Sequence, residues 1–142
     1  MAFYWEDVVA GAELPRLSKE ATTRQLVQYA GASLDFYEIH YDTDFALANG
    51  LPGVVIHGAL KSAWLAQMVT EWMGPDGRIA ALIVRYREVD VPGNLVQCRG
   101  RVMEKYRADG KALVECDVWL ENSQGQRTTE GAITVELASR GT

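Results

Sequence analysis

The chain has few of the residues that build disulfide frameworks and metal centres. It contains two cysteines and two histidines among 142 residues. Cys98 and Cys116 lie in separate strand-like segments, without the Cys-x-x-Cys or Cys/His spacing that is typical of a metal site. We therefore expect two reduced structural cysteines, no metal and no bound cofactor.

Long apolar runs and an excess of basic residues are missing too. The most apolar helix that the sequence predicts, over 58–73, is shorter than the ~20 residues needed to cross a bilayer, so we expect no membrane association. The first residues lack a basic segment followed by an apolar run, so we expect no signal peptide and a cytoplasmic protein. The net charge of −5, with acidic and basic residues interspersed, argues against nucleic acid as the main partner.

The composition that remains is typical of a globular protein, with 48% hydrophobic and 23% charged residues. A chain of this length can bury a sizeable core. No internal repeat, low-complexity tract or linker divides it. We therefore expect one domain over residues 1–142.

An apolar helix, expected over 58–73, organises the predicted fold. Leu60, Trp64, Met68 and Trp72 recur at the spacing of one helical stripe. Small and apolar side chains fill most of the remaining circumference, and the few polar ones are scattered. A helix that is apolar nearly all round predicts burial on every side.

Strand-like segments follow this helix and are separated by short turns. Consecutive strands joined in this way pair antiparallel. We therefore predict an α+β fold in which a curved antiparallel sheet is wrapped around the central helix. The expected strands are 79–89, 95–106, 111–121 and 126–137.

The N-terminal half is expected to contain shorter elements. Residues 3–9 predict an edge strand or an extended lead-in. Thr22-Thr23 is the expected cap of a helix that ends near residue 32. Asp44 is expected to cap one or two further helical turns. The polar and aromatic segment between these two helices has no clean period and predicts a loop with short turns.

Asp35 and His40 lie five residues apart in that loop and form a candidate catalytic pair. A carboxylate and an imidazole together can hold a water molecule and move its proton. Because histidine titrates near neutral pH, it can act as a base and then as an acid. The alternative is an aspartate that caps a turn beside a partly exposed histidine, since this spacing alone is a weak signal.

A second candidate element, His57-Gly58, stands where the central helix begins. Glycine lets a ligand approach the backbone, and the free N–H of Gly58, aided by the helix dipole, could stabilise an enolate oxygen. Ser62, one turn on, could hydrogen-bond into the same pocket or to a carbonyl one turn back. The His57 side chain could contact a ligand or satisfy nearby backbone groups.

These residues carry a resemblance to a known family. The segment 28–67 resembles the hydratase segment of the MaoC-like family, which includes (R)-specific enoyl-CoA hydratases and (3R)-hydroxyacyl-carrier-protein dehydratases. The family pattern is Gly-Asp-x-Asn-Pro-x-His, then Asp-x-x-x-Ala, and later an apolar pair followed by His-Gly. The positions that match it in order and spacing are Asp35, His40, Asp42, Ala46, His57 and Gly58.

The resemblance implies a hotdog fold, with the central helix inside the sheet, and the pairing of such folds into dimers. It also implies reversible hydration of trans-2-enoyl thioesters, or dehydration of (3R)-hydroxyacyl thioesters, carried on coenzyme A or acyl carrier protein. Asp35 and His40 would hold and activate the water, and the N–H of Gly58 would bind the thioester oxygen. Further residues implied at the substrate site are Tyr37, His57 and Ser62.

The sequence departs from the family pattern at several positions. Leu34 replaces the glycine before the aspartate, and Ala66 stands where some members place a pocket-facing serine. Tyr37 and Glu38 stand in place of Asn-Pro, and a phenol cannot supply both the donor and the acceptor of the asparagine amide. These changes predict either a pocket reshaped for another acyl group or a weaker catalyst.

Two other functions fit the same sequence. A thioesterase on this fold also needs a carboxylate or water site, although the His-Gly spacing favours the hydratase branch. The chain could also be a non-catalytic or substrate-binding subunit of a hetero-oligomeric hydratase, which Tyr37 and Glu38 favour. The expected assembly is a homodimer, a higher homo-oligomer, or a heterodimer with another hotdog chain.

Overall fold

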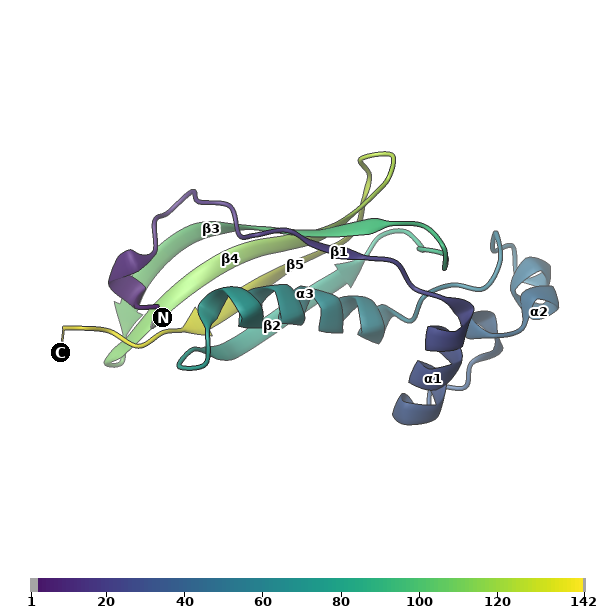
Figure 1. Cartoon of the computed structure of the whole chain (residues 1–142), viewed down its shortest axis with the longest axis horizontal. Helices are drawn as coiled ribbons and strands as arrows, with labels where there is room; N and C mark the ends of the chain where they lie inside the picture. Colours follow the sequence, from purple (N-terminus) through teal and green to yellow (C-terminus); the bar gives the residue numbers. More distant parts are fainter. Residues whose placement is uncertain (1–2, 142) are drawn as a thin grey trace.

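The computed structural model describes residues 3–141 and contains a five-stranded antiparallel sheet (Figure 1). The strands are ordered β1-β3-β4-β5-β2, so the first two strands of the chain form the two edges. The strand bounds are β1 Leu17–Lys19, β2 Arg78–Tyr86, β3 Val96–Ala108, β4 Lys111–Asn122 and β5 Arg127–Glu136. The four strands predicted after the central helix are therefore confirmed.

Local chemistry sets where strands turn and end. Asp109 and Gly110 have positive φ values of 51° and 74°, which is the conformation that the two-residue hairpin turn between β3 and β4 requires. β2 ends at Tyr86 rather than at residue 89 as predicted. The ladder breaks there because the next two amides both donate to the carbonyl of Thr128.

The helices come mainly from the N-terminal half and the centre of the chain. Their bounds are α1 Thr23–Ser33, α2 Thr43–Ala48 and α3 Gly58–Met73, with short 3-10 turns η1 Trp5–Asp7 and η2 Glu38–His40. α1 is capped as predicted by Thr22, whose hydroxyl accepts a hydrogen bond from the amide of Gln25. α2 is capped by Asp42 instead of the predicted Asp44, because the Asp42 carboxylate accepts from the amide of Phe45. No helix within residues 3–141 is long and apolar enough to cross a membrane.

α3 lies along one face of the curled sheet, with the bounds that the sequence predicted (Figure 1). Leu65 and Met68 are buried there in a core that includes Ile133 of β5. The opposite side of α3 is open, and its exposed residues are Ala59, Ala63, Thr70 and Glu71. The prediction of burial on every side is therefore wrong for this chain alone, because the sheet covers only one side of the helix.

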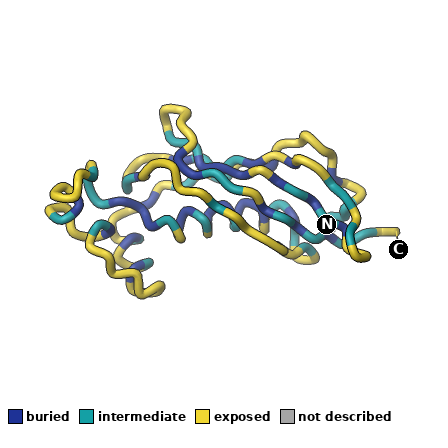
Figure 2. The backbone as a smooth tube through the Cα atoms, turned by 180° about the vertical axis from the view of Figure 1, so that it is seen from behind, coloured by how far each residue is buried: buried dark blue, intermediate teal, exposed yellow. Residues whose placement is uncertain are grey.

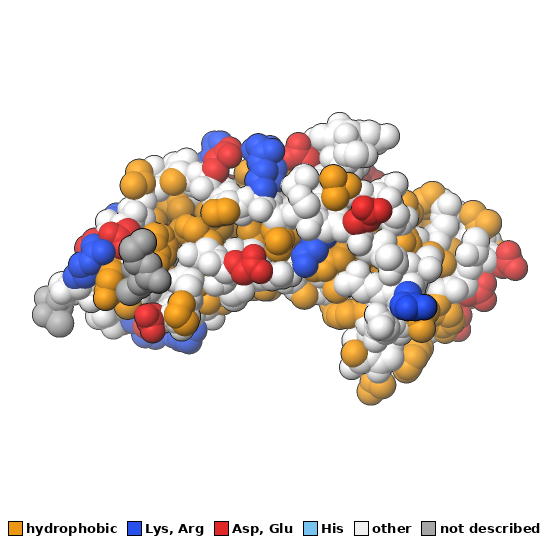
Figure 3. Space-filling view, viewed as in Figure 1, with side chains coloured by type: hydrophobic (Ala, Val, Ile, Leu, Met, Phe, Trp, Pro, Cys, Tyr) orange, Lys and Arg blue, Asp and Glu red, His pale blue; other side chains and the backbone are white. Residues whose placement is uncertain are grey.

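Exposed apolar side chains include those of the edge strand β2 and of the segment from α1 to α2. Leu82 and Ile83 of the edge strand β2 are 38% and 65% exposed. The segment from α1 to α2 extends beyond the end of the sheet (Figure 1), is largely exposed (Figure 2), and carries apolar surface (Figure 3). Its exposed large apolar residues are Val27, Leu34, Phe36, Tyr37, Tyr41 and Leu47. Exposed apolar surface of this kind is typical of faces that bind a ligand or another protein.

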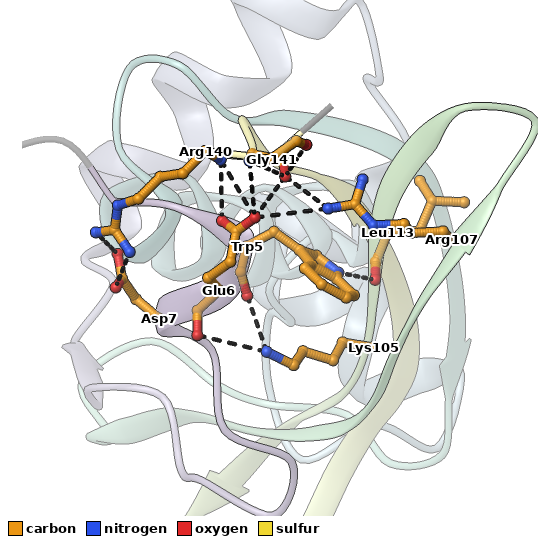
Figure 4. A network of polar contacts seen from close by, with 9 residues as sticks. Trp5, Glu6, Asp7, Lys105, Arg107, Leu113, Arg140 and Gly141 are labelled. Atoms are coloured by element: carbon orange, nitrogen blue, oxygen red, sulfur yellow. Dashed lines mark hydrogen bonds and ion pairs between the residues drawn. The ribbon is translucent and has the colours of Figure 1, made fainter.

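The two ends of the described chain are bound to each other (Figure 4). The carboxylate of Glu6 accepts hydrogen bonds from the hydroxyl of Ser139 and the amide of Arg140, and these bonds lower its pKa to about 2. Asp7 forms an ion pair with the Arg140 guanidinium at 2.8 Å. Residues 3–9 therefore do not form the predicted edge strand, because the turn η1 presents both carboxylates to the C-terminal segment.

Candidate active site

The segment between α1 and α2 carries both predicted catalytic side chains. α1 ends at Ser33 and is followed by its C-cap residue Leu34, whose φ of 63° lies in the left-handed region that favours glycine. The next residue, Asp35, donates its amide to the hydroxyl of Ser33 at 3.2 Å. The turn η2 then brings His40 to a buried position. The glycine of the family pattern thus corresponds to a position where this backbone turns left-handed, and Leu34 occupies it under strain.

Asp35 and His40 face each other. Oδ2 of Asp35 lies 3.7 Å from Nε2 of His40. Nδ1 of His40 lies 2.7 Å from the carbonyl oxygen of Val55, and because a carbonyl only accepts, we assign the ring proton to Nδ1. Nε2 then carries a lone pair on the side of the carboxylate. This is the arrangement of a base that is ready to take a proton from a molecule placed between the two side chains.

His57 packs against the His40 ring. The two imidazoles are stacked, with centroids 3.7 Å apart and ring planes 17° apart. Tyr29 packs edge-on against His57 at 4.8 Å. Nε2 of His57 lies 3.4 Å from the carbonyl oxygen of Asp35, while its Nδ1 is buried without a hydrogen-bond partner. Burial, together with the neighbouring His40, lowers the pKa of His57 below its usual 6.5, so this ring is neutral at neutral pH.

The first turn of α3 lies beside these rings. His57 is the N-cap residue and supplies no side-chain cap, so the start of the helix keeps free amides. A Cβ added to Gly58 would lie 2.8 Å from Cζ of Tyr86, so a larger residue here would displace that ring. The Tyr86 hydroxyl is hydrogen-bonded to the hydroxyl of Ser62 at 2.6 Å. The Tyr86 ring therefore packs against Gly58 in space that a side chain at this position would need.

A pocket of about 500 Å³ opens where these elements meet. His40 and Gly58 are the two predicted site residues that line it. Most of its other side chains are apolar and come from η2, from the loop before α3 and from the end of β2. They include Ile39, Leu51, Pro52, Val55, Ile56, Tyr86 and Val89. A pocket of this kind suits an apolar ligand group.

The remaining predicted site residues lie next to the pocket rather than in its lining. Asp35 and Tyr37 are about half-exposed, and Tyr37 packs edge-on toward the His40 ring at 6.4 Å. His57 is fully buried against His40. The Ser62 hydroxyl is hydrogen-bonded to the hydroxyl of Tyr86, a residue that lines the pocket. The structure thus brings Asp35, His40 and His57 together.

Lys61 and Asp90 form a buried ion pair beside the pocket that no sequence pattern indicated. Their Nζ and Oδ2 atoms are 3.1 Å apart, and the two side chains are 3% and 4% exposed. Lys61, which lines the pocket, also donates to the carbonyl of Glu88, and Asp90 also accepts from the hydroxyl of Thr128. The one available signal was a lysine on an apolar helix, and nothing in the sequence pointed to Asp90 as its partner.

Asp35, His40 and His57 are also the one group within residues 3–141 whose atoms could approach a common metal ion, since their ligand atoms lie within 4.8 Å of one another. The ring geometry fits an ion poorly. The nitrogen lone pairs of each imidazole lie in its ring plane, and the two planes are 17° from parallel with centroids 3.7 Å apart, so one ion cannot easily lie in both planes. Nδ1 of His40 is also engaged by Val55. We therefore interpret the cluster as a proton-transfer site.

Comparison with known proteins agrees with the resemblance seen in the sequence. A family model described as "MaoC like domain" matches residues 9–124. A relative from Mycobacterium tuberculosis, the 3-oxo-4,17-pregnadiene-20-carboxyl-CoA hydratase beta subunit, is 29% identical over 132 residues, which cover 93% of this chain and 97% of that protein.

Solved structures agree on the fold. The ChsH1-ChsH2 complex from Mycobacterium tuberculosis contains a chain that matches with a TM-score of 0.80 and 26% identity, covering 91% of this chain and 98% of that one. The (R)-hydratase from A. caviae involved in PHA biosynthesis matches with a TM-score of 0.85 and 20% identity, covering 93% and 98%. R-hydratase PhaJ1 from Pseudomonas aeruginosa matches with a TM-score of 0.85 and 19% identity, covering 96% and 86%. The fold is the hotdog fold, and the chain belongs to the MaoC-like family.

Proposed function

We propose that the protein catalyses the reversible addition of water to the double bond of a trans-2-enoyl thioester, which gives a (3R)-hydroxyacyl thioester. The observation that carries this proposal is the pairing of Asp35 with a His40 ring whose Nε2 is free to accept a proton. Gly58, the first residue of α3, lines the same pocket, and in this proposal its amide is the oxyanion donor. Hydration of a conjugated thioester needs a base for water and a donor for the developing oxyanion, and these groups supply both.

Asp35 and His40 act on the water. Because Oδ2 and Nε2 are 3.7 Å apart, one water molecule can hydrogen-bond to both atoms. Nε2 takes a proton from the water as its oxygen bonds to C3 of the substrate. The pair then delivers a proton to C2 on the same face, so that the catalyst regains its starting protonation state. Acid–base catalysis of this kind contributes about 10²–10⁴-fold to the rate.

Gly58 acts on the thioester. Attack at C3 moves negative charge onto the thioester oxygen, and the Gly58 N–H at the positive end of the α3 dipole binds it. One such donor is worth on the order of 3 kcal/mol of transition-state stabilisation. The close approach of the Tyr86 ring to Gly58 explains why a glycine is needed at this position.

The substrate is an acyl thioester of coenzyme A or of acyl carrier protein. The mainly aliphatic lining of the pocket favours a hydrocarbon acyl group. The Mycobacterium relative is named for a coenzyme A thioester, which favours coenzyme A as the carrier. Our proposal uses no metal ion and no organic cofactor.

The working unit in this proposal is an assembly of two or more hotdog chains. The exposed edge strand β2, with Leu82 and Ile83, offers unpaired backbone groups and apolar side chains to a further strand. Two of the matched structures, ChsH1-ChsH2 and HadBC, are complexes of named pairs of chains. A second candidate function, a supporting subunit of a hetero-oligomeric hydratase, follows from these complexes and from Tyr37 and Glu38 at the Asn-Pro positions.

Crotonyl-CoA is the substrate that tests the proposal. Loss of its enone absorbance without release of free thiol indicates hydration, whereas release of thiol indicates a thioesterase. Asp35→Asn is the matched variant, and it should lose most turnover with an unchanged circular dichroism spectrum. A purified protein that is inactive alone, on short and long enoyl-CoAs, but gains activity with another hotdog chain would favour the supporting subunit instead.

A further inference from the structure

Asp90, in the loop between β2 and β3, holds the chain on both sides of Gly58. It is only 5% exposed. Its carbonyl oxygen accepts the N–H of Ile56 at 2.9 Å, just before Gly58 in the chain. Its carboxylate binds Nζ of Lys61 at 3.1 Å, in the first turn of α3 after Gly58. The place where α3 begins is therefore fixed by a single buried residue from another part of the chain.

The same set of bonds reaches the proposed base. Val55 accepts the Nδ1–H of His40 at 2.7 Å, and the next residue, Ile56, is the one bonded to Asp90. The Val55 carbonyl that holds the His40 ring and the amide of Gly58 thus lie on one short backbone segment, residues 55–58, which Asp90 holds in place. A displacement of Asp90 would change the distance between the base and the oxyanion donor.

Stability alone does not explain the charged side chains in this arrangement. Lys61 is a cation in the first turn of a helix, where the helix dipole disfavours positive charge. Burying two charges also costs solvation, and apolar residues of similar size are often at least as stable as such a pair. Thr128, which is fully buried, donates a further hydrogen bond to the same oxygen of Asp90 at 2.6 Å. The hydrogen bonds from Lys61 and Thr128 fix the orientation of the Asp90 carboxylate. An apolar side chain in its place would form no such bonds and would leave the two segments less precisely positioned.

We propose that Lys61 and Asp90 are positioning residues, which set the distance between the His40 base and the Gly58 amide in the hydration reaction. This inference rests on the proposed function. In this proposal neither side chain contacts the reacting atoms. Nζ of Lys61 is hydrogen-bonded to the carboxylate of Asp90 and to the carbonyl of Glu88. Their contribution is to the geometry of the site and therefore to turnover.

The paired variant Lys61→Met/Asp90→Leu removes both charges and keeps the backbone bond to Ile56. It should fold, because apolar side chains of similar size can replace a buried ion pair, and the lost acceptor of the Thr128 hydroxyl should lower the unfolding temperature only modestly. Misplacing catalytic groups by a fraction of an ångström to one ångström should lower kcat by about 10–100-fold, while KM should change less than about threefold. The matched control is Arg99→Gln/Glu121→Gln, which breaks another 3.1 Å ion pair away from the pocket and should leave kcat and KM unchanged.

Nuclear magnetic resonance of uniformly 15N-labelled protein gives a readout that does not depend on turnover. The Nδ1 and Nε2 signals of His40 and the exchange rate of the Gly58 amide should change in the paired variant and not in the control. Such changes in a protein without hydratase activity would support the positioning role and reject the proposed function.

A folded paired variant with wild-type kcat and unchanged His40 signals would overturn the inference. If the paired variant does not fold, Asp90→Glu answers the same question, because it keeps the ion pair and lengthens it by one methylene group. It should fold, shift the His40 signals and lower kcat. If Asp90→Glu leaves both the His40 signals and kcat unchanged, the positioning role is again overturned.

Discussion

The imidazole rings of His40 and His57 are stacked 3.7 Å apart, so a proton bound by one ring disfavours a proton on the other. Burial, together with the neighbouring His40, lowers the pKa of His57. Of the two rings, His40 is the one that lines the pocket, and its Nε2 faces the carboxylate of Asp35.

The lowered pKa of His57 predicts a pH dependence of folding. In the unfolded chain the ring titrates near 6.5, and in the folded protein it titrates at a lower pH. Between these two values the unfolded state binds a proton that the folded state does not, so the free energy of unfolding should fall as the pH drops below 6.5. Denaturant unfolding on either side of this pH, in the wild type and in His57→Gln, measures the effect. If the free energy of unfolding changes with pH to the same extent in both proteins, His57 is not the cause of the pH dependence.

Gly58→Ala should impair the site without unfolding the protein. The new methyl group would meet the Tyr86 ring at 2.8 Å, and the displaced ring would crowd the space beside the Gly58 amide. We expect kcat/KM for enoyl-CoA hydration to fall by about 10–100-fold. Gly31→Ala in α1 is the control, because nothing lies within 4 Å of its added methyl group. Equal activity of the two variants would remove Gly58 from the proposed mechanism.

Leu34→Gly should stabilise the protein. Leu34 has a φ of 63° and is 75% exposed, so its side chain gains little from burial. A left-handed conformation costs an L-residue about 1–2 kcal/mol, and the extra flexibility of glycine in the unfolded chain offsets about 0.5–1 kcal/mol of the gain. The expected net increase in the free energy of unfolding is about 0.5 kcal/mol. Val27→Gly, within α1, should instead lower the free energy of unfolding. A loss of stability in both variants would contradict the strain at Leu34.

The sequence predicted the elements around the site because each has a local signal. The apolar stripe and the glycines at both ends defined α3, and the Asp35–His40 motif lay in one loop. The walls of the site could not be predicted in this way. Tyr86 meets Ser62 across 24 residues of sequence, and Lys61 meets Asp90 across 29, and no local pattern encodes either contact.

The exposed side of α3 shows a second limit of the sequence pattern. An apolar helix surface has the same composition whether its own sheet or another chain covers it. Ala59 and Ala63 therefore led to a prediction of burial that is wrong for this chain alone, which leaves both residues exposed. In the same way, Glu6 and Asp7 gave no local sign that they would bind the C-terminal segment rather than extend a strand.

Glu6→Gln should weaken the contact between the two ends of the chain. The Glu6 carboxylate has a pKa of about 2 in the folded protein, against 4.5 for an ordinary glutamate. Its contribution to stability is therefore present above pH 4.5 and is lost as the pH falls toward 2. Thermal unfolding of the wild type and Glu6→Gln should differ near neutral pH and converge in acid. A constant difference at all pH values would show that the charge of Glu6 is not involved.

The account depends most on His40 as the base that takes a proton from water. The direct measurement is the rate of crotonyl-CoA hydration by the wild type and by His40→Ala, with the fold and oligomeric state of both proteins verified. We predict that the variant keeps the fold and loses about 10²–10⁴-fold in turnover. A folded His40→Ala protein that hydrates crotonyl-CoA at close to the wild-type rate would contradict the account.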